Sequence, residues 1–498
     1  MMKENEQDRL MDAIGEIDER TVAMAHGKKR AAPVWRWAGA AAACVALALL
    51  AAVLLRPTGT DEPKKPSPPG GGTTALAAYA AAQAVYPDTP QRPSEDDWEK
   101  GDDYVSELTE QWCAAQRARQ TQSAAYAGTL ESFLRRTAPV FLSGEAAENR
   151  LYSPVNVYLA LAMLAELTDG NSRGQILALL DAPDIETVRQ RAKALWAAQY
   201  QNDGLTACVL AASVWLADDL TFVPETLRTL AQDYYASSFR GEMGSPELDA
   251  ALQAWLNEQT GGLLEEQASS VSLPPETVLA LATTVYFRTQ WSQKFYDGNT
   301  EPDTFHAAGG DVMCDFMHQY DTLNTVYAGE GFAALALDLE SGGKLWLLLP
   351  EEGVTPEELV QNGEATDFLL ADKSEWAERN TYLVDLSLPK FDVSSETDLG
   401  EGLRSLGVTD VFDDALSDFT PMTTDMTGIY VSRASHAVRV AVDEEGVTAA
   451  AFTVIMTCGS ALPQGEKYVF TVDRPFFFAI TGEDETPLFT GVVHTPAA

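Results

Sequence analysis

The spacing of apolar and polar residues predicts helices in the first part of the chain and strands in the later part. Apolar positions three and four residues apart predict helices over 123–137, 155–167, 227–235 and 246–259. Apolar runs rich in β-branched and aromatic residues predict strands over 278–287, 333–339, 344–349 and 381–388. Helices followed by strands indicate an α+β fold rather than an alternating parallel sheet.

One segment near the C-terminus departs from this pattern. Residues 442–453 read VDEEGVTAAAFT, so that three acids and a glycine precede small residues. CGSALPQ at 458–464 and an apolar, strand-like run at 468–480 follow. A long loop inside a compact domain is usually functional or disordered. The Val, Thr and Phe residues in this loop nevertheless suit a half-buried strand. The segment therefore predicts a loop that can become a strand, with an ordinary hairpin and a turn at 459–465 as the alternative.

A second distinctive segment lies near the N-terminus. Residues 37–55, WAGAAAACVALALLAAVLL, contain no charge and lie between Arg36 and Arg56. This length crosses a bilayer as a helix, although a buried helix is the alternative. No small-residue cleavage site follows the run, which argues against a signal peptide. More basic side chains precede the run than closely follow it. We therefore expect a single-pass protein of the cell membrane with residues 1–36 in the cytoplasm and the rest outside.

The chain after this segment divides into three parts. Residues 56–74 are rich in Pro and Gly and predict a linker. Residues 75–120 show a helical pattern that acidic residues and prolines interrupt. They are interpreted as a helical and acidic extension whose structure the sequence leaves uncertain. We expect the globular domain to cover 121–498.

Charge and cysteine content restrict the possible partners. The net charge is −40, and residues 1–65 carry nearly equal numbers of acids and bases, so the excess negative charge lies beyond them. This argues against binding to nucleic acid and to anionic lipid. The five cysteines are widely spaced without a CxxC pair, which indicates neither a disulfide framework nor a metal site. The chain has no N-x-S/T sequence, which disfavours a glycosylated eukaryotic secretory protein, and we expect a bacterial source.

The sequence contains no recognisable catalytic motif. There are five histidines, and no GxSxG, HExxH or GxxxxGK[ST] pattern is present. We therefore expect a protein that is not an enzyme and that needs no cofactor. We expect His436 and Trp291 to form a structural pair rather than a catalytic one, and acid pairs such as Glu444-Glu445 to be solvated charge.

Several motifs in consistent order resemble one family. EEGVTAAAFT at 444–453 resembles the hinge of serpin reactive loops, and DRPFFF at 473–478 and PLFTGVVH at 487–494 resemble its C-terminal strands. Weaker matches are NRLYSP at 149–154, AWL at 254–256 with Thr260 and Gly262, VYFRTQW at 285–291, LPKF at 388–391, and His436. Over 121–498 the chain is identified as a member of the serpin family. The resemblance implies an α+β serpin-like fold with a large central sheet, additional sheets, about nine helices and an exposed reactive loop.

The resemblance also implies a function. A serpin is expected to be a monomer that traps a serine or cysteine protease as a covalent acyl complex, after which the cut loop inserts into the main sheet. The implied hinge residues are Glu444, Glu445, Gly446, Val447, Thr448, Ala449, Ala450 and Ala451. The family's spacing places the cut at Ser460–Ala461, and Met456, Cys458 and Leu462 remain candidates. Small residues at the cut suggest an elastase-like target.

On insertion, alternate hinge residues would face the core, and none of them is charged or proline. These inward residues are Val447, Ala449, Ala451, Thr453 and Ile455. The implied sheet-opening region comprises Ser153, Asn156, Thr283, Trp291 and His436.

Three residues depart from the family pattern. Asn156 stands where the family usually has Ser, and Thr283 and Gln253 stand where it usually has Asn. These departures favour an alternative, a non-inhibitory serpin that acts as a binding or structural module. A transmembrane sensor that responds to loop cleavage is a third reading, weakened by the shortness of residues 1–36.

Overall fold

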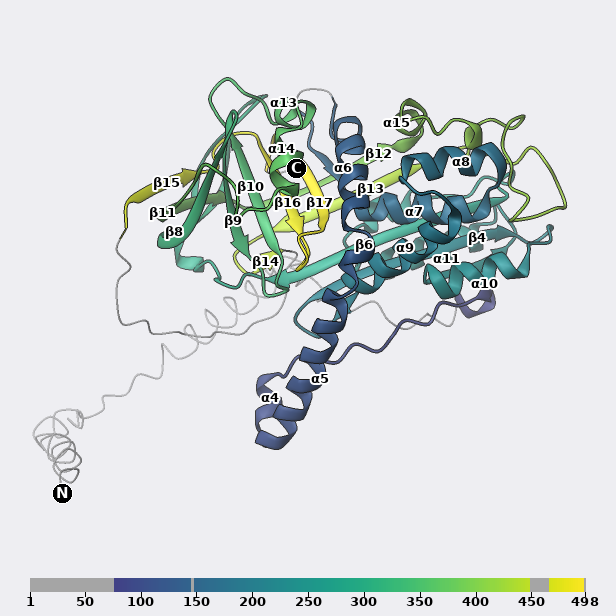
Figure 1. The fold of residues 1–498 in the computed structure, drawn as a ribbon, viewed down its shortest axis with the longest axis horizontal. Helices are drawn as coiled ribbons and strands as arrows, with labels where there is room; N and C mark the ends of the chain where they lie inside the picture. Colours follow the sequence, from purple (N-terminus) through teal and green to yellow (C-terminus); the bar gives the residue numbers. More distant parts are fainter. Residues whose placement is uncertain (1–75, 145–146, 448–464, 497–498) are drawn as a thin grey trace, which may run out of the picture. The chain divides into compact units, whose positions relative to one another are not determined.

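The computed structural model describes residues 76–144, 147–447 and 465–496 (Figure 1). The predicted membrane segment 37–55, the linker 56–74 and most of the reactive loop lie outside these ranges. Within the described ranges, no helix combines the length and the apolar character that crossing a bilayer requires.

The first of two large sheets, here called the main sheet, has eight strands. Their order is β1-β5-β4-β6-β14-β13-β12, and β3 pairs with β4 beside this path. Neighbours are antiparallel except for β4 and β5, which are parallel. The strands are β1 Ala80–Ala82, β3 Gln201–Asn202, β4 Ala207–Ala217, β5 Ala236–Gly241, β6 Leu279–Gln290, β12 Phe391–Asp398, β13 Ser435–Val442 and β14 Gly446–Val447.

The second sheet has nine strands and contains most of the C-terminal chain. Their order is β15-β11-β8-β9-β10-β16-β17-β2, and β7 pairs with β8 beside this path. The strands are β2 Arg150–Tyr152, β7 Thr300–Ala307, β8 Gly310–Gly329, β9 Phe332–Asp338, β10 Lys344–Pro350, β11 Arg379–Pro389, β15 Lys467–Thr471, β16 Phe476–Thr481 and β17 Pro487–Val493.

Helices cover these sheets, and α7 lies in the core between them. Its N-cap is Ser153, whose side chain accepts a hydrogen bond from the backbone of Asn156, and Pro154 occupies the first turn. Because α7 is apolar on all sides, it can only be stable when fully surrounded, and it contacts β6 of the main sheet and β17 of the second. The helices are α4 Glu95–Trp98, α5 Asp102–Gln120, α6 Ala127–Phe141, α7 Pro154–Leu167, α8 Gly170–Leu179, α9 Ile185–Gln199, α10 Pro224–Asp233, α11 Pro246–Gln259, α12 Glu265–Ser269, α13 Pro356–Gln361, α14 Glu364–Leu370 and α15 Leu399–Ser405.

The α+β class predicted from the sequence is confirmed, and most predicted elements are present. The helix predicted over 246–259 is α11, and the one predicted over 155–167 is α7 with one further residue at its start. The run over 468–480, expected as a single strand, is two strands, β15 and β16. The chain turns between them at 473–475, where the Arg474 guanidinium donates to the carbonyl of Pro350 at 2.9 Å.

Residues 76–120, which the sequence left unassigned, are part of the same folded unit. Strand β1 extends the main sheet by pairing with β5. The ring of Tyr86 lies 5.4 Å from that of Trp196, and the Trp112 indole donates to Asp203 at 2.8 Å. The folded chain therefore begins before residue 121, because an edge strand joins this extension to β5 and side-chain contacts join it to α9 and to the loop between β3 and β4.

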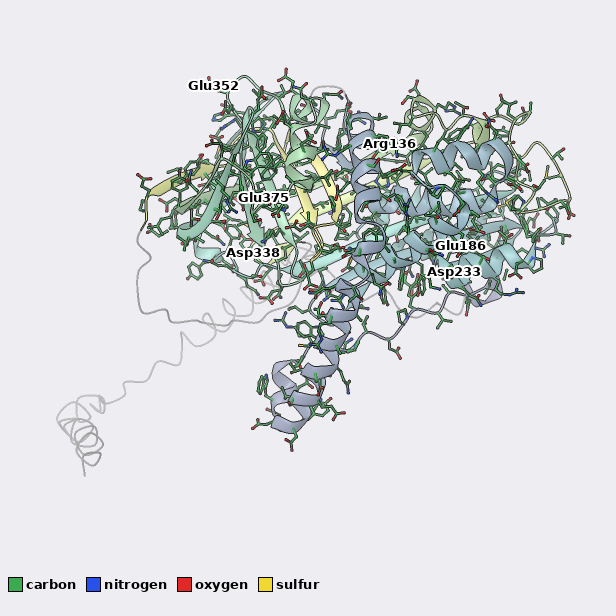
Figure 2. All side chains as sticks on the ribbon, in the orientation of Figure 1. Arg136, Glu186, Asp233, Asp338, Glu352 and Glu375 are labelled. Atoms are coloured by element: carbon green, nitrogen blue, oxygen red, sulfur yellow. The ribbon has the colours of Figure 1, made fainter. Side chains whose placement is uncertain are left out.

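The acidic side chains that Figure 2 labels lie at the surface, exposed or half-buried. Figure 2 labels Glu186, Asp233, Asp338, Glu352 and Glu375, which come from well-separated parts of the chain. Glu186 and Asp233 share Arg189 as a partner, at 2.7 Å and 4.0 Å. These labelled acids remain in contact with water, and their negative charge favours solubility of the folded domain.

Candidate functional site

The predicted hinge begins as a tight turn at the end of β13. The carboxylate of Asp443 accepts hydrogen bonds from the backbone N–H groups of Glu445 and Gly446, at 2.9 and 3.2 Å. The backbone of Asp443 donates in turn to the carbonyl of Gly446 at 3.1 Å. An Asp that bonds the backbone two residues ahead is a common way to start a turn. The turn sends the hinge back along β13.

The first two hinge residues after this turn already form a strand of the main sheet. Val447 pairs with Thr289 of β6 on one side and with Val442 of β13 on the other. Its side chain is 1% exposed. Gly446 faces Gln290, and a Cβ atom at this position would lie 2.2 Å from the carbonyl oxygen of Thr289. Only glycine allows β6 and β14 to approach so closely.

Two lysines from loops elsewhere in the chain bind the hinge acids. The ammonium of Lys390 lies 2.9 Å from the Glu444 carboxylate, to which the Thr300 hydroxyl also donates at 2.8 Å. Lys294 lies 2.6 Å from Glu445. Burial alone would raise the pKa of Glu444, but the bonds from Lys390 and Thr300 outweigh it and hold the pKa below its usual range. These acids are therefore fixed ion pairs and not only solvated charge.

Trp291, which follows β6, also binds this turn. Its indole N–H donates to the carbonyl of Asp443 at 2.8 Å, and its backbone N–H donates to Glu445 at 3.1 Å. Its buried ring meets Phe295 edge to face at 5.8 Å, and the Phe295 backbone bonds to Glu444. Trp291 therefore anchors the hinge.

The remaining predicted sheet-opening residues form a second cluster. The backbone N–H of Ser153 donates to Nε2 of His436 at 3.0 Å, and its hydroxyl donates to the carbonyl of Leu488 at 2.7 Å. The Asn156 amide donates to the carbonyl of Thr283 at 3.3 Å. Complete burial lowers the pKa of His436 to about 4. The imidazole is therefore neutral at pH 7, and because Nε2 accepts, the proton is on Nδ1.

The structure does not bring Trp291 and His436 together, contrary to the expected pair. His436 pairs with Thr397 near the start of β13, whereas Trp291 contacts the turn beyond its end. The six steps along the strand from His436 to Val442 span roughly 20 Å. The predicted region is therefore two sites, a hinge anchor at Trp291 and a cluster of Ser153, Asn156, Thr283 and His436.

Strand β14 links two strands that otherwise remain separate in the described part of the chain. Away from Gly446 and Val447, β6 pairs with β4, and β13 pairs with β12. In the described residues, β6 and β13 do not pair directly with each other. A strand that continued from Val447 would therefore find backbone partners on both sides.

The rest of the predicted site lies outside the described residues. This holds for Thr448 to Ala451, for Ser460 and Ala461, and for the alternative positions Met456, Cys458 and Leu462. Sequence reasoning missed Lys390, Thr300 and Lys294 as partners of the hinge acids, because they are far away in the chain. Asp443 carried a usable signal, since an Asp before a glycine-containing turn is typical of such a bond.

Comparison with known proteins identifies the fold and the family. The family model described as "Serpin (serine protease inhibitor)" matches residues 132–496. Putative serpin-Z12 from Oryza sativa subsp. japonica is 29% identical over 376 residues, which cover 71% of this chain and 87% of the relative. Serpin B11 from Mus musculus is 26% identical over 378 residues, covering 71% and 95%. The thermophilic serpin tengpin in its native state is a structural neighbour with a TM-score of 0.65 and 24% identity, covering 74% of this chain and 94% of that one.

Proposed function

The chain belongs to the serpin family of protease inhibitors, and we propose that it is a suicide-substrate inhibitor whose cut loop inserts into the main sheet. Membership of this family supports a protease inhibitor rather than an enzyme. The expected target is a serine protease, with cysteine proteases as a further class. No cofactor or metal is needed for this function.

One observation supports the insertion step above all others. Gly446 and Val447 already lie between β6 and β13, so the hinge enters the sheet at the place where a further strand would continue. The residues that would follow on the inward side are small or apolar. About 15 inserted residues at ~3.3 Å each would carry an attached protease ~50 Å.

In the proposed reaction, the protease catalyses the steps up to formation of the acyl-enzyme. Its nucleophile attacks the carbonyl carbon of Ser460, the bond to Ala461 breaks, and the new amine of Ala461 leaves with a proton. The ester now joins the hinge side of the loop to the protease. Insertion drags the protease against the inhibitor and distorts its triad, so water cannot complete deacylation. The free energy comes from new ladder hydrogen bonds and buried side chains.

The target preference and the location are part of the same proposal. Small residues at Ser460–Ala461 fit an elastase-like protease. The uncharged run at 37–55 supports a single-pass tether in the cell membrane, with the inhibitor domain outside. The bacterial source rests on the missing N-x-S/T sequence alone, and the plant and mouse relatives named above give it no support. Protease shaving of intact cells should remove the domain, and protection until lysis would contradict this orientation.

A denaturing gel tests the inhibitory function. Residues 75–498 are mixed with elastase-like and trypsin-like serine proteases, and the mixture is run under denaturing conditions. We expect a band at the summed mass of protease and inhibitor. Protease whose nucleophile has been blocked beforehand is the control and should give no such band. Complete loop cleavage without this band in every mixture would contradict the trapping mechanism.

A non-inhibitory binding module is the second candidate. The departures at Asn156, Thr283 and Gln253 favour it, because they lie where the sheet opens. Each of these residues is nevertheless accommodated, since Asn156 bonds to Thr283 and the Gln253 amide donates to Val271 at 2.8 Å. A cut loop with no covalent complex would make this candidate the better one.

A further inference from the structure

The strand that follows the reactive loop contributes to an apolar face that the trapping mechanism does not use. Along one row, Leu323 of β8 faces Leu383 of β11, which faces Lys467 of β15. Two residues further, Asp385 faces Val469. Partners in neighbouring strands project from the same side of a sheet, and so do residues two apart in one strand. These side chains therefore share one face.

The same face continues across a bulge in β8. Register between β8 and β11 shifts at Val384 and Leu386, which places Tyr320 and Asp321 opposite Asp385. The Tyr320 ring stacks on His318 at 5.9 Å, and His318 bonds to the hydroxyl of Ser387, its partner in β11, at 2.9 Å. Tyr320 therefore lies on the same side as Leu323. We name Tyr320, Leu323, Leu383 and Val469, with Asp321, Asp385 and Lys467, the outer patch.

The outer patch is apolar and slightly negative, and its apolar side chains are exposed apart from Leu383, which is only 7% exposed. Tyr320 and Leu323 are each 59% exposed, and Val469 is 70% exposed. Lys467 lies 2.7 Å from Asp321 and 3.5 Å from Asp385, so one ammonium is shared by two carboxylates. Single exposed apolar residues are ordinary, whereas several gathered on one face of adjacent strands mark a contact surface. A partner would need an apolar surface with basic side chains beside it.

The position of the outer patch identifies this partner. The carbonyl of Glu466 accepts a hydrogen bond from Leu383, so the reactive loop ends against the patch. Five residues lie between Ala461 and Lys467, which limits the distance between the two to at most roughly 20 Å. A serine protease of about 230 residues has a radius of gyration of roughly 17 Å. A protease bound at Ser460–Ala461 is therefore large enough to reach β15.

We infer that the outer patch is a docking surface for the target protease, which contacts it with the rim of its active-site cleft. This inference rests on the proposed inhibitory function and adds the surface that contributes to target choice. The loop supplies the scissile bond, while the outer patch supplies additional area and a charge preference for basic proteases. Such contacts raise the rate of association. Whether the acyl-enzyme is trapped or hydrolysed depends on insertion of the hinge.

Truncation of the patch tests the inference. Leu323→Ser and Val469→Ser remove apolar contact, and Leu416→Ser is the matched control, because Leu416 is 58% exposed in a loop outside the patch. The variants are made in residues 75–498, and association rate constants are measured with elastase-, chymotrypsin- and trypsin-class proteases. With the protease that forms the covalent complex, each patch variant should associate roughly three- to tenfold more slowly. The control should match the parent.

Two further measurements separate docking from folding. The number of inhibitor molecules consumed per protease and the melting temperature should stay at the parent values in the patch variants. Asp321→Asn keeps a residue that tolerates the positive φ at this position, and it should reduce the salt dependence of association. Parent-like association of both patch variants would overturn the docking surface while leaving the proposed function intact. Complex formation with none of the three proteases would overturn both.

Discussion

Replacement of Val447 by Arg probes the hinge at its most constrained point. The Val447 side chain is almost completely buried between β6 and β13, a burial worth roughly 1.5–3 kcal/mol. An unpaired guanidinium at the same place would cost several kcal/mol. The cheaper response is to release β14 from the sheet. When β14 leaves the sheet, the burial of Val447 and a few backbone hydrogen bonds are lost. The backbone entropy that each freed residue regains offsets this loss by roughly 1–2 kcal/mol.

The variant should therefore be slightly less stable and much less inhibitory. A net loss of about 1–3 kcal/mol over the roughly 400 residues that the structure describes lowers the melting temperature by roughly 1–4 °C. Insertion of the cut loop would still require the introduced arginine side chain to enter the sheet. An added barrier of about 4 kcal/mol slows insertion roughly a thousandfold. Deacylation should then be faster than insertion, so the protease should cut the loop as a substrate and be released.

The assay combines thermal unfolding with a denaturing gel of protease mixtures. Val447→Thr is the matched control, because threonine is also β-branched and uncharged, and it should keep most of the covalent complex. Val447→Arg should give cleaved inhibitor with little complex. An unchanged melting temperature together with undiminished complex formation would refute the conclusion that insertion proceeds from an already buried Val447.

Two further predictions concern Gly446 and His436. Gly446→Ala places a Cβ atom 2.2 Å from the Thr289 carbonyl oxygen, so we expect β14 to be displaced and the melting temperature to fall. Gly309→Ala, with nothing within 4 Å of the added atom, should have little effect, and equal melting temperatures for the two variants would contradict this. His436 has a pKa of about 4 when folded and about 6.5 when unfolded, so the unfolded state binds more protons between these values. Stability should fall by on the order of 3 kcal/mol as the pH drops from 6.5 to 4, measured as urea unfolding relative to His436→Gln; parallel pH profiles for the two proteins would rule this out.

The sequence predicted those elements whose signals are local. Helix α11 begins at a proline preceded by a capping Ser245, and α7 begins at Ser153-Pro154, so both starts were predictable. Strands β15 and β16 were predicted as one strand, because the residues of 468–480 are apolar apart from Thr471 and the turn at 473–475. Strand β1 had no local signal, since Ala80–Ala82 becomes a strand only through its pairing with β5.

The site was predictable in composition but not in arrangement. The hinge could be located from EEGVTAAAFT. That Gly446 and Val447 already lie in the sheet of the uncut chain could not be predicted, because it depends on the register of β6 and β13. The same register separates His436 from Trp291. Lys390 and Lys294 come from other parts of the chain. Their pairing with Glu444 and Glu445 is set by the fold and could not be predicted from the sequence.

Thermal unfolding of the intact and the loop-cleaved domain tests the central claim most directly. Residues 75–498 are cut within the loop, the site is located by mass spectrometry, and both forms are heated under the same conditions. If the hinge continues from Val447 into the sheet, cleavage adds a strand paired on both edges and buries its inward side chains. The cleaved form should then melt at a clearly higher temperature, with the cut between Met456 and Gln464. Equal melting temperatures would mean that no insertion occurs.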